Sequence, residues 1–158
     1  MKKQIIEQLL TKVRAELKAL EEASKSAKDY VTSGDVKSDG KYDTRGIEAG
    51  YLAGAQEKRV EELKLELQML EEIPIRDFKK DEEVAIGALV DLSFKNQTRK
   101  YFIAPTAGGT MLMIDKNPIL VISTFSPIGD AAFGTTLGEE FELETPQELR
   151  VYKVVDIA

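Results

Sequence analysis

Two long stretches of the chain carry apolar or small residues at alternating spacings of three and four positions. The first stretch runs through Ile6, Leu10, Val13, Leu17, Leu20, Ser24 and Ala27. The second runs through Ala49, Ala53, Gln56, Val60, Leu63, Leu67 and Leu70, before Pro74 ends it. A repeat averaging about 3.5 residues is typical of helices that pack along one seam. The chain therefore begins with two helices, each with one apolar face.

The segment between these helices is polar and rich in turn formers. It contains glycine, aspartate and serine over residues 31–45, which favour a turn over a continued helix. The two arms match in length, at about 28 residues or roughly 42 Å each. Matched arms and a short connection predict an antiparallel coiled-coil hairpin over residues 1–75, with its tip near 31–45.

Three glycines, Gly46, Gly50 and Gly54, recur every fourth position in the second arm. Each glycine inside a helix costs about 1 kcal/mol relative to alanine, so the repeat needs a reason. The glycines could allow a close helix crossing. They could equally thin the far end of the hairpin so that it enters a narrow space. The spacing leaves both explanations open.

Beyond residue 78 the pattern changes to short apolar or alternating runs. Six such runs lie at 84–94, 99–105, 111–114, 119–124, 140–143 and 149–157. The turn-forming groups between them predict an antiparallel sheet. Residues 126–140 break the rhythm and predict one short helix packed on the sheet. We therefore predict an α+β protein whose second domain spans residues 79–158.

The amino-acid composition excludes several classes of function. The net charge is −6, and there is no histidine or cysteine. An acidic chain repels phosphate backbones, so any role on nucleic acid passes through a partner. The absence of both residue types excludes thiolate nucleophiles, histidine bases and most zinc sites. Charges interrupt the N-terminal apolar residues before they reach signal-peptide or membrane-span length, so we expect a cytoplasmic protein that does not enter a membrane.

The acidic tip is the most notable polar cluster. Asp35, Asp39 and Asp43 recur at spacing four in this turn, beside Lys41 and Arg45. Magnesium is commonly held by one or two carboxylates together with water and phosphate oxygens. The tip could thus supply part of a metal site that a partner completes. The simpler explanation is an exposed turn kept acidic for solubility.

The order of hairpin, polar tip and β-rich body resembles the Gre transcript-cleavage factors over nearly the whole chain. Residues 126–157 are similar to the family's S-P-x-x-x-A-L-x-G-x-x-x-G-D stretch and the two strands that follow it. The resemblance implies an FK506-binding-protein-like fold for the body. It also implies docking on the rim of the secondary channel of bacterial RNA polymerase, with Ser126, Pro127 and Phe125 at the contact.

The tip is similar to the family's D-L-x-E-N-A-E-Y stretch. Asp35 and Tyr42 match without a gap, whereas Ser38 stands in place of the glutamate and Lys41 replaces an acidic position. The resemblance implies that Asp35, with Asp39 as the second carboxylate, positions Mg²⁺ shared with the polymerase active centre. Tyr42, Lys41 and Arg45 would contact the partner. We expect no cofactor in the free protein.

These observations predict an accessory transcription elongation factor, not an enzyme, which stimulates RNA cleavage by the polymerase. The departures at Ser38 and Lys41 keep open a second reading, a channel regulator that binds the polymerase without stimulating cleavage. A prolyl isomerase or chaperone is suggested only by the fold that the resemblance implies. A structural coiled-coil adaptor and self-association through the hairpin also stay open.

Overall fold

A computed structural model describes residues 1–32 and 45–158 of the chain. Two long helices come first, α1 (Lys2–Thr32) and α2 (Arg45–Glu71). Six strands and one short helix follow. They are β1 (Leu89–Phe94), β2 (Gln97–Ala104), β3 (Met111–Ile114), β4 (Asn117–Ser123), α3 (Pro127–Ala132), β5 (Glu140–Glu144) and β6 (Leu149–Ile157). This is the predicted α+β order, with helices first and the sheet after them. Within the described ranges, no helix combines the length and apolar character needed to cross a membrane.

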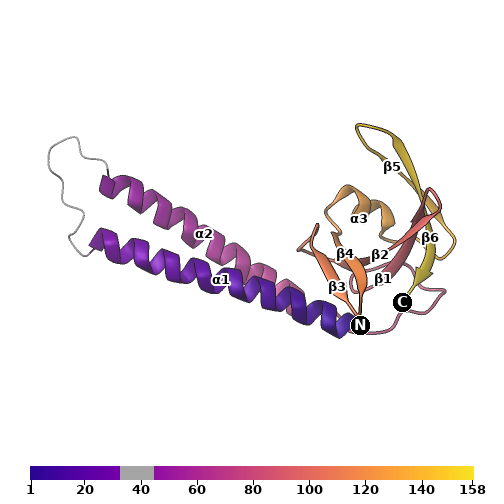
Figure 1. Cartoon of the computed structure of the whole chain (residues 1–158), viewed down its shortest axis with the longest axis horizontal. Helices are drawn as coiled ribbons and strands as arrows, with labels where there is room; N and C mark the ends of the chain where they lie inside the picture. The colour runs from indigo at the N-terminus through magenta and orange to yellow at the C-terminus, as the bar shows by residue number, and fades with distance from the viewer. Residues whose placement is uncertain (33–44) are drawn as a thin grey trace. The chain divides into compact units, whose positions relative to one another are not determined.

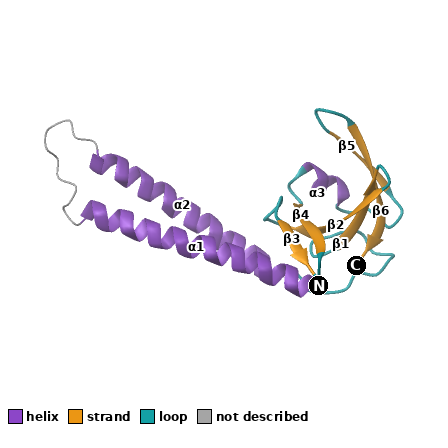
Figure 2. Cartoon of the chain, viewed as in Figure 1, coloured by secondary structure: helices purple, strands orange, loops and turns teal. Residues whose placement is uncertain are grey.

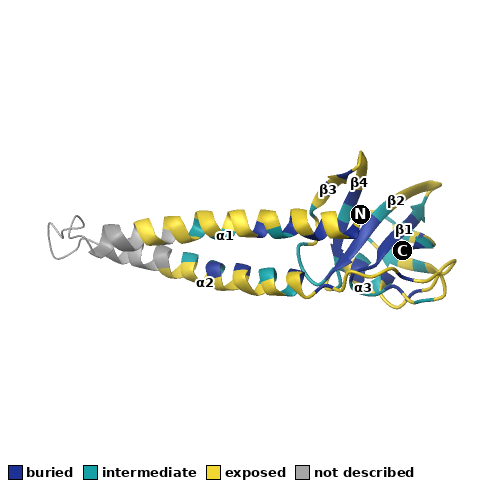
Figure 3. Cartoon of the chain, turned by 90° about the horizontal axis from the view of Figure 1, so that it is seen from below, coloured by how far each residue is buried: buried dark blue, intermediate teal, exposed yellow. Residues whose placement is uncertain are grey.

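The chain groups into two compact units, residues 11–68 and residues 1–10 together with 69–158. Within residues 11–68, α1 and α2 run side by side in opposite directions (Figure 1; Figure 3). Val13, Val60 and Leu63 from the predicted seams are buried, and Arg59 of α2 forms an ion pair with Glu16 of α1 at 3.0 Å. The predicted helical hairpin is confirmed. The division of the sequence at residues 75–79 stays a prediction.

In the first turns of α1, residues beside the predicted seam are buried as well as residues on it. Ile5 and Leu9, which precede seam positions Ile6 and Leu10 by one residue, are 0% and 1% exposed. They belong to the compact unit that includes residues 69–158. Because adjacent residues on a helix point about 100° apart, a seam of period 3.5 accounts for only part of this burial.

The strands form one six-stranded sheet in the order β3-β4-β2-β1-β6-β5 (Figure 2). Tight turns join β1 to β2 and β3 to β4. Lys95 and Asn96 in the first turn, and Asp115 and Lys116 in the second, all have positive φ. Two such residues in succession are typical of two-residue hairpin turns whose twist matches that of the strands.

One strand pair departs from the predicted antiparallel arrangement. β2 and β4 run parallel, with Phe102 opposite Val121, whereas the other four pairings are antiparallel. The chain leaves β2, forms β3 at the sheet edge, and returns through a tight turn as β4 between β3 and β2. Since an inserted hairpin returns its second strand in the direction of β2, the pairing is parallel.

α3 packs on one side of this sheet and contacts β4 and β5. Its side of the sheet carries the buried residues Val90, Leu92, Tyr101, Ile103, Ile122, Tyr152 and Val154, which belong to one core cluster. Figure 3 shows the corresponding dark-blue ribbon across the middle of the sheet. This core holds the β4–α3 connection, where the predicted contact residues lie.

Candidate functional site

The Ser126-Pro127 pair starts α3. The Ser126 hydroxyl accepts a hydrogen bond from the Gly129 N–H at 3.1 Å and donates one to the Ser123 carbonyl at 2.7 Å. Pro127 occupies the first turn of the helix, where its missing N–H and restricted φ are tolerated. Both residues thus have a structural role in fixing the turn between β4 and α3.

Gly129 allows this turn to be tight. A Cβ at this position would lie only 1.8 Å from the carbonyl oxygen of Ser123, far inside van der Waals contact. Gly129 itself is buried. The sequence Ser-Pro-x-Gly therefore brings the start of α3 against the end of β4 and leaves Phe125 at the outside of the turn.

Phe125 is 82% exposed, the highest value among the large apolar side chains that the structure describes. Its ring lies at a groove of about 570 Å³. The groove is lined by Pro105, Thr106, Ala107, Gly108, Gly109, Leu120, Ile122, Ser123, Phe125, Ser126 and Ile128. We call this the Phe125 groove. An exposed aromatic beside an apolar hollow is typical of a protein-binding surface.

The 105–109 loop was not identified from the sequence as part of this surface. A Cβ on Gly108 would lie 2.9 Å from the Ser123 Cβ, so the loop approaches the β4–α3 turn because this residue is glycine. The Gly108-Gly109 pair is a recognisable turn signal. Its place beside Ser123 depends on the parallel pairing of β2 with β4, which local patterns do not specify.

The other predicted site residues belong to the tip. Asp35, Asp39, Lys41 and Tyr42 lie outside the described residues, and Arg45 is the first residue of α2. Among the described residues, no group of three or more acidic, histidine or cysteine side chains is placed to hold a metal ion. The tip lies outside the described residues, so the metal-positioning role of Asp35 and Asp39 stays a prediction.

Residues 79–158 match the family described as "Transcription elongation factor, GreA/GreB, C-term". The chain belongs to this family, and the resemblance read from the sequence is confirmed. The match covers β1 to β6 and α3, which include the Phe125 groove. An accessory role in transcription agrees with this membership.

Curated relatives extend the similarity into the hairpin. The transcription inhibitor protein Gfh1 of Thermus thermophilus is 26% identical over 96% of this chain and 91% of its own length. The transcription elongation factor GreA of Syntrophus aciditrophicus is 28% identical over 78% of this chain and 71% of its own.

Solved structures include Gfh1 of Thermus thermophilus, at 22% identity, a TM-score of 0.39 and coverage of 94% of both chains. Gfh1 of Thermus aquaticus has 21% identity and a TM-score of 0.41, covering 93% of this chain and 92% of its own.

Proposed function

We propose that this chain binds bacterial RNA polymerase at the rim of the secondary channel and regulates transcription by placing its hairpin in that channel. The Phe125 groove provides the docking surface. The hairpin tip carries the charged residues that act inside the channel. The protein needs no active centre of its own, because the partner supplies the catalytic site and the affinity for RNA.

The observation that carries this proposal is the exposure of Phe125 beside an apolar groove. Leaving a phenylalanine 82% exposed forgoes about 1.5–3 kcal/mol of burial free energy. That free energy is available to a partner whose apolar side chains enter the groove. Large aromatic side chains often dominate the free energy of protein–protein association. The groove is also lined by Ser126, one of the residues that the family resemblance implies at the contact.

Regulation without cleavage is the outcome that we favour. The relative named a transcription inhibitor matches 96% of this chain, hairpin included. The tip also has Ser38 where the cleavage-factor pattern has a glutamate, and Lys41 at a position that is acidic there. Serine lacks the charge of a hard metal ligand, and a lysine nearby disfavours cation binding. In this case the hairpin acts by occupying the channel.

Stimulation of RNA cleavage is the second candidate. It rests on the similarity to a GreA elongation factor and on the two carboxylates Asp35 and Asp39 in the tip. These carboxylates would help to hold Mg²⁺ shared with the polymerase active centre. The Mg²⁺ held by these residues would supply Lewis-acid activation of water for phosphodiester hydrolysis. Tyr42 and Arg45 would then contact the surrounding polymerase or RNA.

One experiment separates these outcomes. RNA cleavage and polymerase binding are measured in parallel on backtracked elongation complexes of the cognate polymerase, with intact protein and with an Asp35→Ala, Asp39→Ala variant. Binding with inhibited elongation and no cleavage supports the channel-regulator proposal. Cleavage that the double variant loses, while it still binds, supports the second candidate. Failure of the intact protein to bind would overturn both.

The docking surface is tested by Phe125→Ala, with Phe133→Ala as the matched control. Phe133 is also exposed, at 49%, but it does not line the groove. We expect Phe125→Ala to weaken polymerase binding at least tenfold, since a central aromatic anchor contributes about 2 kcal/mol or more. Equal binding by both variants would remove the groove from the interface. If the intact protein did not bind the polymerase but catalysed proline isomerisation in a peptide, the prolyl isomerase alternative would be favoured. If it bound other proteins and not the polymerase, the adaptor alternative would be favoured.

A further inference from the structure

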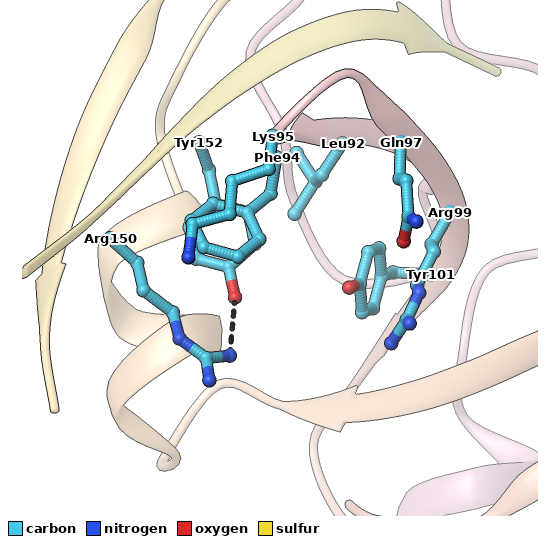
Figure 4. A pocket seen from close by; sticks show the side chains of 8 residues that line it. All are labelled: Leu92, Phe94, Lys95, Gln97, Arg99, Tyr101, Arg150 and Tyr152. Carbon is cyan, nitrogen blue, oxygen red and sulfur yellow. Dashed lines mark hydrogen bonds between the residues drawn. The ribbon is translucent and has the colours of Figure 1, made fainter. Parts of the chain in front are cut away.

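A second cavity, of about 270 Å³, opens on the sheet where β1, β2 and β6 lie next to one another (Figure 4). It is lined by Leu92, Phe94, Lys95, Gln97, Arg99, Tyr101, Arg150 and Tyr152. We call it the cationic pocket. It shares no lining residue with the Phe125 groove, so the proposed docking surface does not account for it.

Strand register brings these residues together. Leu92 of β1 lies opposite Arg99 of β2, and Phe94 lies opposite Gln97 across the tight turn. Side chains two positions apart on a strand share a face, which places Arg150 and Tyr152 of β6 on one side of their strand. Lys95 enters from the turn. Three strands and one turn therefore contribute to the pocket, and its composition cannot be read from any one segment.

The pocket concentrates positive charge on a chain whose net charge is −6. Its lining contains three cations, Lys95, Arg99 and Arg150, and no carboxylate. Glu148 lies beside it, 2.7 Å from the Lys95 Nζ and 3.4 Å from the Arg150 Nε. One carboxylate cannot neutralise three cations. Arg99 makes no hydrogen bond or ion pair with any residue that the structure describes, so its guanidinium is available to a ligand.

Hydrogen-bond donors accompany the charge. The Arg150 Nη1 donates to the Tyr152 hydroxyl at 3.4 Å, as the dashed line in Figure 4 shows. The Arg150 Nε is buried and has no hydrogen-bond partner among the described residues, although it is 3.4 Å from Glu148. Glu148 is thus an ion-pair partner of this N–H that does not meet hydrogen-bond geometry. In Figure 4 the Tyr101 hydroxyl points into the space between Arg99 and Tyr152.

Aromatic rings hold two of the cations in place. The Lys95 Nζ lies 5.1 Å and the Arg150 Cζ 5.2 Å from the centre of the Phe94 ring. Phe94 packs on Tyr152 with ring centres 5.2 Å apart, and Leu92, which also lines the pocket, is 1% exposed. Cation–π contacts of this kind restrict the charged groups before any ligand arrives. Preorganisation lowers the entropic cost of binding.

We propose that the cationic pocket binds a carboxylate carried on an apolar stem. A guanidinium presents paired N–H donors that match the two oxygens of a carboxylate, and both Arg99 and Arg150 line the space. The apolar surfaces of Leu92, Phe94 and Tyr152 suit an aromatic or aliphatic stem. A phosphate dianion fits less well, because Glu148 repels its second charge and the apolar surfaces offer it no donors.

The cavity volume limits the ligand. At about 270 Å³ it lies just below the range of about 300–1,000 Å³ that is usual for drug-sized ligands. It therefore suits a small organic acid or a single acidic or C-terminal residue of a peptide. Both sources present the same chemistry to the pocket.

The test uses the ¹⁵N-labelled full chain without polymerase, so its result is independent of the proposed docking function. The protein is titrated with 3-phenylpropionate, with the uncharged 3-phenylpropionamide and with inorganic phosphate, and amide chemical shifts are followed. We expect saturable shifts from β1, β2 and β6 with the carboxylate. The amide and phosphate should bind at least tenfold more weakly. An acetylated Phe-Glu dipeptide amide and its Phe-Gln counterpart show whether a peptide carboxylate binds more tightly than the free acid.

Arg99→Gln is the first variant, since Arg99 is exposed and the fold should tolerate the change. Arg150→Gln is the second. Lys153→Gln is the matched control, because Lys153 also lies on β6 but at a position of opposite alternation outside the pocket. We expect either arginine variant to weaken carboxylate binding at least tenfold and the control to leave it unchanged. Equal binding of acid and amide, shifts that do not saturate, or no effect of Arg99→Gln would overturn the proposal.

Discussion

The Lys2 ammonium donates a hydrogen bond to the backbone carbonyl of Arg76, at 2.5 Å and across 74 positions of sequence. The same ammonium lies 4.6 Å from the centre of the Phe78 ring. Lys2 is only 9% exposed, which is unusual for a lysine. Burial lowers its pKa, while Asp77 acts in the opposite direction. The contact ties the start of α1 to the segment that follows α2, within one compact unit.

Replacing Lys2 by methionine should lower the free energy of unfolding by about 1–3 kcal/mol. Methionine keeps most of the apolar stem but leaves the Arg76 carbonyl without its charged donor. Urea unfolding followed by circular dichroism measures the change. Lys3→Met is the control, because its side chain is 77% exposed and its loss should matter by less than about 0.5 kcal/mol. Equal losses in the two variants would show that the Lys2 contact adds no stability.

Shortening a leucine of α2 should lower the stability of the protein at a buried seam position and hardly change it at an exposed position. Leu63 is fully buried, whereas Leu65, two residues along α2, is 58% exposed. We expect Leu63→Ala to lower the free energy of unfolding by about 2–5 kcal/mol, since it removes buried methyl groups and leaves a cavity. Leu65→Ala should change it by less than about 0.5 kcal/mol. Thermal and urea unfolding of both variants tests the difference.

Gly54 distinguishes the two explanations for the glycine repeat. Apart from its own helix backbone and chain neighbours, no described heavy atom lies within 4 Å of the position that a Cβ would take. Gly54→Ala should therefore stabilise the protein by up to about 1 kcal/mol, as measured by urea unfolding. The reverse change at the next residue, Ala55→Gly, should destabilise it by a similar amount.

A stabilised Gly54→Ala protein that regulates its polymerase less well would favour clearance in a narrow space as the reason for this glycine. A destabilised Gly54→Ala protein would instead show that the position requires close helix packing, and would contradict the open surroundings seen at this residue.

Gly129 should be intolerant of any side chain. Alanine at this position would force its Cβ against the Ser123 carbonyl oxygen and displace α3 from β4. We expect Gly129→Ala to lower the free energy of unfolding by about 1–3 kcal/mol or more. The displacement of α3 should also change the amide NMR signals of residues around the Phe125 groove. Asp130→Ala, at the exposed next residue, is the control and should preserve both stability and spectrum.

Tyr101 should make stability depend on alkaline pH. Burial raises its pKa in the folded protein, with a further contribution from Tyr152. Above the unfolded-state pKa of about 10, the unfolded chain releases this proton before the folded protein does, so stability falls as pH rises. Tyr101→Phe should lose stability less steeply than the intact protein between about pH 9 and 11. Parallel slopes from urea unfolding at several pH values would contradict burial of an un-ionised hydroxyl.

Much of this architecture could be read from local patterns. The period of 3.5 residues identified both helices, the short alternating runs identified the six strands, and Ser126-Pro127 marked the start of α3. These signals are local, because helix seams, strand alternation and turn residues reflect backbone geometry over a few positions. The family resemblance rested on the same segments.

Other features required the tertiary structure. Ile5 and Leu9 lie outside the seam read from the sequence, yet both are buried, and they belong to the compact unit that includes residues 69–158. The parallel pairing of β2 with β4 follows from the insertion of a hairpin beside β2. Periodicity cannot report it, since parallel and antiparallel strands share the same alternation of side chains.

The sequence by itself thus determined the order and type of the elements, the acidic character of the chain and its family. The tertiary structure alone decided which distant residues share a surface, including Gly108 beside Ser123 in the Phe125 groove and Arg99 near Arg150 in the cationic pocket. The physical reason is that propensity and periodicity act over neighbouring residues, whereas a binding surface is assembled by strand order and register over the whole sheet.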